Sequence, residues 1–224
     1  MDNTKKNYIW AGVYFVLFLL LIVIIKTVDV AAIGPENTSI GLSHINGYVH
    51  EMFGINHGLY VMTKMFGLLS FALVGVFVLI GLIQLVQRKS VSKVDREILC
   101  LGGLYALVAV TFALFEVIII NYRPIIEEGA EHVEASFPST HTLIIVTVWA
   151  SFMLIMDKYI KNDILKRVLR IASMVIICLT VIGRLACGVH WFTDILGGCL
   201  ISLCYINLFA AVSTSSNSTA GERK

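Results

Sequence analysis

Charged residues are scarce in this chain. Lys, Arg, Asp and Glu make up 14% of its 224 residues, whereas apolar residues make up 58%. A soluble globular domain averages about 25% charged residues, so this composition cannot cover a surface exposed to water. The shortage excludes a soluble enzyme and a disordered chain. The formal net charge of +2 is too small for the basic surface that nucleic acid requires. We therefore expect an integral membrane protein with no nucleic-acid partner.

Prolines and paired cysteines are also few. The chain has 3 prolines, and none lies at the centre of a long apolar run. Its 5 cysteines fall inside apolar stretches, and none belongs to a CxxC pair. An odd number of cysteines in such stretches argues against a disulfide framework. We expect them to pack as small apolar side chains between helices.

Long apolar stretches recur along the chain. A helix that crosses a bilayer needs about 20 apolar residues. Stretches of this kind cover residues 7–25, 65–87, 98–120, 135–156, 171–187 and 190–212. They predict an all-α fold, a six-transmembrane-helix bundle that forms one domain over residues 1–212. The polar residues 213–224 are expected to form a disordered cytoplasmic tail. The first stretch is longer than the roughly 7–15 apolar residues of a signal peptide, so we expect a retained anchor.

The basic residues orient this bundle. Lys and Arg concentrate at both termini and in residues 88–96 and 158–170, which all fall on one side of the predicted membrane. The other side carries only Lys26, Lys64, Arg123 and Arg184. Because the side rich in Lys and Arg is usually cytoplasmic, we expect a multi-pass protein of the cell membrane with both termini in the cytoplasm.

Two long loops lie on the predicted outer side of the membrane. In residues 29–57, Ser43 is a plausible N-cap, and apolar residues follow it at near-helical spacing. This predicts a short interfacial helix in the first outer loop, which we expect to seal the bundle rather than to gate it. The loop at residues 121–138 holds four carboxylates within eight residues. They lack the alternating spacing of a calcium loop, so we expect a solvated acidic loop.

Ionisable and hydroxyl side chains gather near the outer ends of the spans. Charged groups inside a membrane are costly and therefore mark candidate functional positions. The candidates are Glu116, Arg123, Ser139, His141, Arg184, His190 and Asp194. The topology places all of them at one level of the membrane. The sequence therefore predicts one site, which opens on the extracytoplasmic side.

The residue types in this set suit phosphate chemistry. His190 and Asp194 are four residues apart, so they would share one face of a helix. A carboxylate bound to one imidazole nitrogen leaves the other nitrogen free to act as a nucleophile. Arg123 and Arg184 remain charged at any pH, and their planar guanidinium groups can bind the oxygens of a tetrahedral anion.

The segment Pro138-Ser139-Thr140-His141 begins the fourth span. Ser139 or Thr140 can cap this helix, and its free N–H groups form an anion site. His141 is then placed to protonate a departing alkoxide as a general acid. Taken alone, Ser139 could merely cap a helix while His141 faces the interface, but the neighbouring candidates favour the catalytic interpretation.

Three motifs resemble those of a known family. They are Arg123-Pro124, Pro138-Ser139-Thr140-His141 and Arg184-x5-His190-x3-Asp194. Their order, their intervals and the six-span layout resemble the type 2 phosphatidic acid phosphatase (PAP2) superfamily over roughly residues 1–212. The resemblance implies a metal-independent membrane phosphatase without a cofactor, acting on a lipid phosphate such as a polyprenyl diphosphate, phosphatidic acid or phosphatidylglycerophosphate.

The resemblance also implies a role for each motif residue. His190 would form a phosphohistidine intermediate, Asp194 would orient it, and His141 would protonate the leaving group. The phosphoryl oxygens would be held by Arg123, Arg184, Ser139 and backbone N–H groups near Thr140. Glu116 stands where the family usually has a lysine, Thr140 where it usually has glycine, and Gly183 where it usually has serine. We expect Glu116 to pair with an arginine, to be partly protonated, or to bind a cationic group of the substrate.

Other functions remain open at this stage. A membrane transporter would also carry intramembrane charges, although these gather at one surface and do not line a path across. A metallohydrolase could use His190, Asp194, His141 and Glu116 as ligands, but two arginines in the same cavity disfavour a cation. A non-catalytic phospholipid-binding relative is a further alternative because of Glu116. The sequence leaves the particular lipid and the oligomeric state open.

Overall fold

The computed structural model describes residues 3–214. These residues form seven α-helices and two short 3-10 helices. In chain order they are α1 Asn3–Thr27, η1 Pro35–Asn37, α2 Ser43–Phe53, α3 His57–Arg88, η2 Val91–Lys93, α4 Arg96–Val117, α5 Thr140–Tyr159, α6 Asp163–Ala186 and α7 Phe192–Thr214. The all-α prediction is confirmed over this part of the chain. The tail predicted at residues 213–224 lies outside the described residues from 215 onward, and its first two residues belong to α7.

Six of the described helices are long and apolar enough to cross a membrane, and α2 is the exception. The six-span prediction is therefore confirmed, but some helix ends differ from it. The third span ends at Val117, before the run Ile118-Ile119-Ile120, whose β-branched side chains disfavour helix. α5 begins at Thr140 with Ser139 as its N-cap residue, within the segment expected to begin this helix. α7 begins at Phe192, so His190 precedes it.

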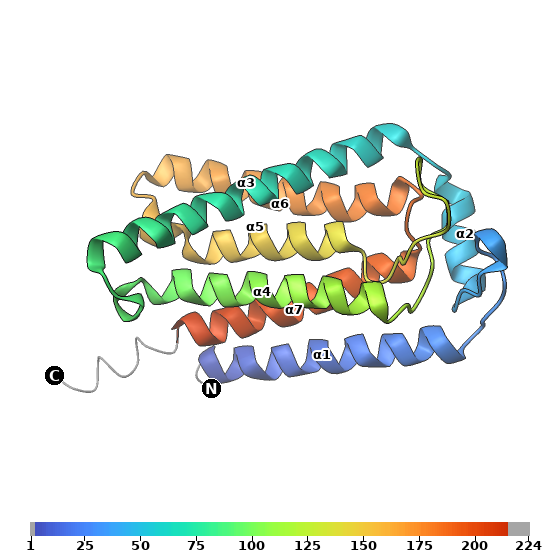
Figure 1. The fold of residues 1–224 in the computed structure, drawn as a ribbon, viewed down its shortest axis with the longest axis horizontal. Helices are drawn as coiled ribbons and strands as arrows, with labels where there is room; N and C mark the ends of the chain where they lie inside the picture. Colours follow the sequence, from blue (N-terminus) through green and yellow to red (C-terminus); the bar gives the residue numbers. More distant parts are fainter. Residues whose placement is uncertain (1–2, 215–224) are drawn as a thin grey trace.

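The six long helices run side by side, and α2 lies across one end of them (Figure 1). We call this the α2 end. The opposite end, the terminal end, holds both described chain ends and the α3–α4 and α5–α6 turns. α5 contacts α3, α4, α6 and α7, and α1 packs along α7. α5 and α7 are also the most buried spans. The two helices at the centre of the bundle are thus the ones that begin next to the predicted motifs.

Two glycines let α7 approach the beginning of α5. A Cβ atom on Gly197 would lie 2.3 Å from the Phe137 ring, and one on Gly198 would lie 2.9 Å from the Cβ of Thr142. Small residues at helix contacts are the usual means by which membrane helices come close together. Gly197 and Gly198 therefore fix the segment before α5 against the first turns of α7.

Polar side chains inside the bundle bind one another across helices. The indole Nε1 of Trp149 on α5 donates to Ser70 Oγ on α3 at 2.9 Å. The hydroxyls of Thr111 on α4 and Tyr205 on α7 are 2.5 Å apart. Such bonds satisfy groups that hydrocarbon would leave without a partner, and they fix the relative positions of the helices.

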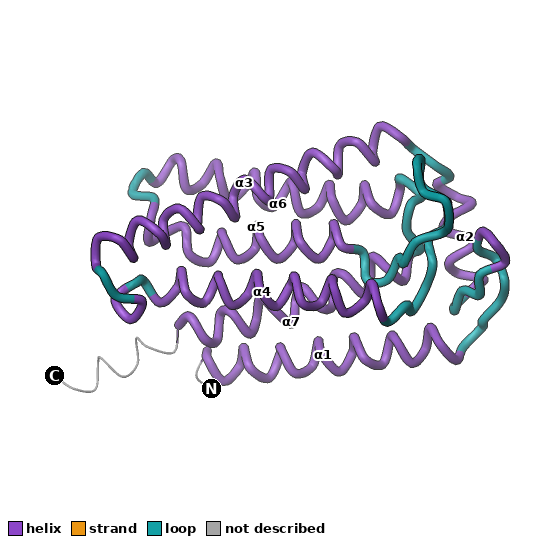
Figure 2. The backbone as a smooth tube through the Cα atoms, viewed as in Figure 1, coloured by secondary structure: helices purple, strands orange, loops and turns teal. Residues whose placement is uncertain are grey.

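The short helix α2 covers the beginning of α7. Asn46 is fully buried, and its side-chain amide donates to Thr193 Oγ1 at 3.1 Å and accepts from the Thr193 backbone N–H at 3.2 Å. The His50 ring lies 5.4 Å from that of Trp191. These contacts agree with a seal over the bundle, at the end where the longer loops gather (Figure 2). The N-cap prediction is wrong by one residue: Leu42 holds that position, and Ser43 Oγ donates to Asp29.

Candidate active site

Five segments of the chain bring the predicted arginines, histidines and Asp194 to the α2 end. Arg184 lies in the last turn of α6, Asp194 in the first turn of α7, His141 in the first turn of α5, and Arg123 in the segment between α4 and α5. His190 lies in the α6–α7 turn. Gly188 makes that turn with φ +71°, and a Cβ there would lie 2.1 Å from the carbonyl oxygen of Gly54. Only glycine fits this position, which brings the chain back toward the bundle.

His190 is held through one nitrogen and free at the other. Its side chain is buried, and Nδ1 lies 3.0 Å from Ser136 Oγ. Ser136 in turn donates its hydroxyl hydrogen to Asp194 Oδ2. Because a hydroxyl has a single hydrogen, Ser136 accepts from Nδ1, which therefore carries the proton. The buried Nε2 has no hydrogen-bond partner among the described residues, so its lone pair is available.

The helical spacing predicted a direct hydrogen bond between Asp194 and His190, and this prediction is wrong. Asp194 Oδ2 lies 3.7 Å from His190 Nδ1, too far for a hydrogen bond. The reason is that α7 begins at Phe192, so His190 precedes the helix and the i, i+4 geometry does not apply. Ser136, from the segment before α5, bridges the two side chains.

Asp194 joins three segments of the chain. Its fully buried carboxylate also accepts from the Trp191 backbone N–H at 2.9 Å and from Asn121 Nδ2 at 3.4 Å. Its backbone carbonyl accepts from the Ser139 N–H at 3.0 Å. A buried carboxylate persists only when several donors satisfy it. Asp194 is therefore the centre that fixes His190, the start of α5 and residue 121 relative to one another.

The environment of His190 favours the neutral imidazole. Burial chiefly lowers the pKa of His190 well below its ordinary value, and the positive charges of Arg184 and Arg123 lower it further. A neutral ring with its proton on Nδ1 is the form that can attack phosphorus through Nε2.

Arg184 is a buried cation without a carboxylate partner among the described residues. It is fully buried, and Nη1 donates to Thr63 Oγ1 at 3.4 Å. The guanidinium carbon lies 5.6 Å from the centroid of the Tyr60 ring, and the buried Nε has no described hydrogen-bond partner. An unpaired buried charge is unfavourable, and a bound anion would compensate it.

Arg123 already carries two carboxylates. Its Nη1 lies 2.5 Å from Glu127 Oε1, and its Nε lies 3.4 Å from Glu134 Oε2. The second oxygen of Glu127 accepts from the Tyr60 hydroxyl at 2.9 Å. The prediction of a solvated acidic loop is therefore wrong for Glu127, which links this loop to α3. A substrate anion would compete with Glu127 for Arg123.

The start of α5 offers hydrogen-bond donors and an imidazole. Ser139 is the N-cap residue, but its side chain makes no capping bond and instead accepts from Thr142 Oγ1 at 3.1 Å. Its own hydroxyl hydrogen therefore remains available. Thr140 and His141 occupy the first turn, where backbone N–H groups lack partners within the helix. The His141 ring faces α3 at Gly67, where a Cβ would lie 3.3 Å from its Cδ2 atom.

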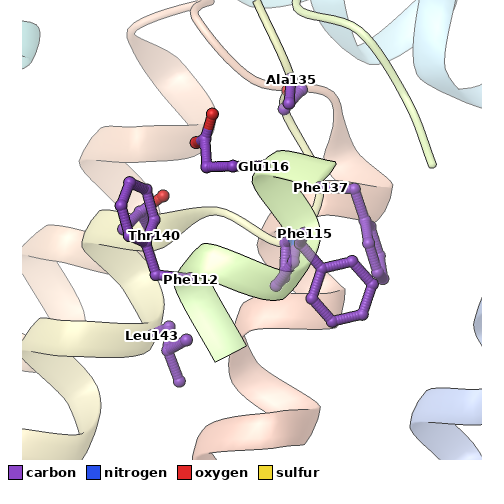
Figure 3. Close-up of a pocket in the computed structure, with 9 residues that line it drawn as sticks. Phe112, Phe115, Glu116, Ala135, Phe137, Thr140 and Leu143 are labelled. Atoms are coloured by element: carbon purple, nitrogen blue, oxygen red, sulfur yellow. The ribbon is translucent and has the colours of Figure 1, made fainter. Parts of the chain in front are cut away.

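Glu116 lies apart from the arginines. Its exposed side chain leaves the last turn of α4 on the side away from the Phe115 and Phe137 rings, at a small pocket that Thr140 also lines (Figure 3). The expectation that it pairs with an arginine is wrong. Because α4 ends at Val117, residues 118–123 are not helical, and Glu116 and Arg123 do not share a helical face.

An apolar cavity of about 410 Å³ is lined in part by His141, and it opens at the surface of the bundle, where Phe71 and Phe112 are exposed. It lies between α3, α4 and α5, and its lining is almost entirely hydrocarbon. The residues that line it are Gly67, Phe71, Val74, Tyr105, Val108, Ala109, Phe112, Thr140, His141, Ile144, Ile145 and Val148. The arrangement joins a hydrophobic cavity to a group of cations and imidazoles, as an amphiphilic ligand requires.

Several contributors were not predicted from the sequence. Ser136 lies only three residues before Ser139, in the same segment, and its place next to that motif was the available signal. Tyr60, Lys64 and Glu127 had no such signal, because they come from a different helix or from an acidic run. Among residues 3–214, no three His, Cys, Asp or Glu side chains lie together as a metal site would require.

Comparisons with known proteins identify the family of the chain and a solved structure of similar fold. The model of the PAP2 superfamily matches residues 68–217, more than half of the chain. A crystal structure described as the first transmembrane PAP2 type phosphatidylglycerolphosphate phosphatase, from Bacillus subtilis, has a similar fold, with a TM-score of 0.61 at 20% sequence identity. The match covers 96% of this chain and 97% of that one. A search of curated proteins finds no match. With its six apolar spans, the chain is a multi-pass membrane protein that belongs to the PAP2 superfamily.

Proposed function

We propose that the chain is an integral membrane lipid phosphatase, which hydrolyses a phosphate monoester or diphosphate of a membrane-anchored substrate through a phosphohistidine at His190. One observation carries this proposal. The buried Nε2 of His190 has no described partner, while Nδ1 is fixed by Ser136 and, through it, by Asp194. A neutral imidazole aimed in this way, beside two arginines, is an activated nucleophile for a tetrahedral anion.

In the first step His190 Nε2 attacks phosphorus, and the bond between phosphorus and the leaving oxygen breaks. His141, in its protonated form, gives its proton to that oxygen. The ring of His190 becomes positively charged, and its Nδ1–H keeps its hydrogen bond to Ser136. Arg123, Arg184, the Ser139 hydroxyl and the N–H groups at the start of α5, Thr140 included, bind the phosphoryl oxygens.

In the second step water attacks the phosphohistidine. His141, now neutral, takes a proton from that water, the bond between nitrogen and phosphorus breaks, and inorganic phosphate leaves. His190 returns to its neutral form with its proton on Nδ1. Each step uses only the side chains of this chain and one water.

The cavity between α3, α4 and α5 supports a lipid as substrate. His141, the proposed proton donor to the leaving group, is part of its lining, and the mostly apolar lining suits a hydrocarbon chain. The Bacillus subtilis protein of similar fold is described as a phosphatidylglycerolphosphate phosphatase. A related glycerophospholipid is accordingly one candidate substrate, and a polyprenyl diphosphate is another.

The charge distribution supports one orientation in the membrane. The basic segments at residues 88–96 and 158–170 both lie at the terminal end. By the positive-inside tendency that end is cytoplasmic, together with both termini. The site at the α2 end then opens on the extracytoplasmic side of the cell membrane.

The proposal is tested with protein purified in detergent and a panel of lipid phosphates and diphosphates. We expect release of inorganic phosphate, inhibition by orthovanadate and resistance to chelators. His190→Ala should abolish release, whereas His132→Ala, at an exposed loop position, should not. A folded wild-type protein that binds these lipids but releases no phosphate would instead be a lipid-binding relative or a transporter. Loss of activity with a chelator alone would indicate a metallohydrolase.

A further inference from the structure

Lys64 extends from α3 toward the candidate site. Its Nζ lies 4.3 Å from the centroid of the Tyr60 ring, the same ring that the Arg184 guanidinium approaches. Tyr60, Lys64 and Gly67 follow one another at helical spacing and therefore share one face of α3. Gly67 on this face lies against the His141 ring. Lys64 thus lies one turn beyond His141, toward the α2 end.

The charge balance makes Lys64 significant. Arg123 is already neutralised by Glu127 and Glu134. Arg184 and Lys64 form no ion pair with a carboxylate in the described part of the chain. Arg184 is buried and Lys64 is exposed, and both place a positive charge without a direct carboxylate partner next to Tyr60, which itself binds Glu127.

Lys64 lies on the side of the site where the leaving group would be. Gly67, which shares a face of α3 with Lys64, lies against the His141 ring. His141 is the proton donor to the leaving oxygen in the proposed reaction, and it also lines the apolar cavity proposed for the substrate chain. A group bound between His141 and Lys64 would therefore belong to the departing part of the substrate.

We propose that Lys64 is a specificity-determining residue that binds negative charge on the leaving group, so that the enzyme favours a lipid diphosphate over the monophosphate of the same lipid. This rests on the proposed function. With a diphosphate, His190 Nε2 bonds to the terminal phosphorus, and the bond from that phosphorus to the bridging oxygen breaks. The bridging oxygen keeps the electron pair and takes the proton of His141. The lipid monophosphate departs with its remaining charge held by Lys64.

The other explanation for Lys64 is that it only extends its ammonium group to the membrane interface. Long basic side chains often do so near helix ends. Lys26 offers a matched control, because it lies near the last residue of α1 at the same end of the bundle. Its Nζ donates to the Ile119 carbonyl at 3.1 Å and does not approach Tyr60.

The test compares Lys64→Met, Lys64→Arg and Lys26→Met on a diphosphate and a monophosphate with the same hydrocarbon chain. A hydrogen bond to a charged group contributes about 1.5–3 kcal/mol, which corresponds to a factor of roughly 10–100. We expect Lys64→Met to lower kcat/KM for the diphosphate by about that factor and for the monophosphate by about threefold or less. Lys64→Arg should retain most activity, and Lys26→Met should change neither substrate by more than about twofold.

Equal losses on the two substrates, or no loss on either, would overturn the assignment to Lys64. An equal loss in Lys26→Met would point to general surface charge and would overturn it as well.

Binding of inorganic diphosphate and of orthophosphate tests the role of Lys64 separately from the proposed function. If the wild-type protein hydrolyses neither lipid, the proposed function fails, and Lys64 is then judged by calorimetry. Lys64→Met should weaken binding of diphosphate about tenfold and leave orthophosphate binding unchanged; equal binding of diphosphate by both proteins would refute the inference.

Discussion

The hydroxyl oxygen of Ser136 lies 3.0 Å from His190 Nδ1 and donates its hydrogen to the Asp194 carboxylate. A serine from the segment before α5 thus stands between the nucleophile and the carboxylate that was expected to orient it. The chain of hydrogen bonds fixes the tautomer of His190. Through Ser136, the Asp194 carboxylate also stabilises the positive charge of the ring when the ring is phosphorylated. Ser136 is therefore a positioning residue, since it acts on phosphorus only through His190.

Replacing Ser136 should slow turnover without weakening the binding of an anion at the site. Ser136→Ala removes the bridge and leaves His190 Nδ1 about as far from Asp194 as the present 3.7 Å. We expect kcat to fall by roughly 10–100-fold, the loss of one hydrogen bond to a charged group. Inhibition by orthovanadate should change little. Ser173→Ala, a buried serine in the middle of α6 whose hydroxyl donates to the Leu169 carbonyl, is the control. An unchanged kcat in Ser136→Ala would refute the role.

A methyl group at Gly67 should disturb the proton donor. The Cβ of Gly67→Ala would lie 3.3 Å from Cδ2 and 3.5 Å from Nε2 of His141, so the ring must shift by a few tenths of an ångström. We expect kcat to fall about fivefold with a smaller change in KM. Gly75→Ala lies on the same helix with nothing within 4 Å of its Cβ, and it shares the gain in helix propensity. Equal rates in the two variants would contradict the placement of His141.

Removing the charge of Glu127 should strengthen anion binding. Glu127 occupies Arg123 at 2.5 Å and is held there by the Tyr60 hydroxyl. Glu127→Gln keeps the size of the side chain but frees the guanidinium for a phosphate oxygen. We expect the inhibition constant of orthovanadate to fall about 2–5-fold, in line with the loss of a partly exposed ion pair. Glu128→Gln, at the exposed neighbouring position, should have no such effect. A weaker inhibition in Glu127→Gln would show that Glu127 chiefly positions Arg123.

The buried His190 should make the protein less stable in acid. Burial holds the pKa of His190 well below 6.5, so the folded protein stays unprotonated there while the unfolded chain takes up a proton. The free energy of unfolding therefore falls as the pH drops below about 6.5, by at most about 1.4 kcal/mol per pH unit for this group.

His190→Asn removes this titration and keeps a donor near Ser136. Thermal unfolding in detergent, followed from pH 7.5 to 5.0, should show a smaller acid destabilisation in the variant than in the wild type. His132→Asn, with its side chain 82% exposed, serves as the control. Parallel curves for the wild type and His190→Asn would mean that His190 is already charged in the fold.

Much of the architecture could be predicted from the sequence, because long apolar stretches identify membrane spans. Six spans and the short helix of the first loop were predicted correctly. The errors fell at helix ends, where local effects decide. The helix was expected to continue through the isoleucines at 118–120, and to include His190 at the other end of the site. Each error changed which residues share a face.

The site was harder to predict because its contacts cross between distant segments. The motif spacing correctly brought His190 and Asp194 to one place, but it could not show that Ser136 stands between them. The sequence showed that Glu116 is charged, but the direction of its side chain depends on where α4 ends. Lys64 and Tyr60 lie more than 50 residues from any motif, and only the packing of α3 against α5 and α6 brings them to the site.

The measurement that tests the central claim most directly is capture of the phosphorylated enzyme. Purified protein is mixed with a lipid substrate labelled in the phosphoryl group, quenched within milliseconds in base, and digested for mass spectrometry. We predict one phosphorylated peptide, with the phosphoryl group on His190, labile to acid and absent from His190→Ala. Phosphate release without any phosphohistidine, or continued release by His190→Ala, would contradict the account.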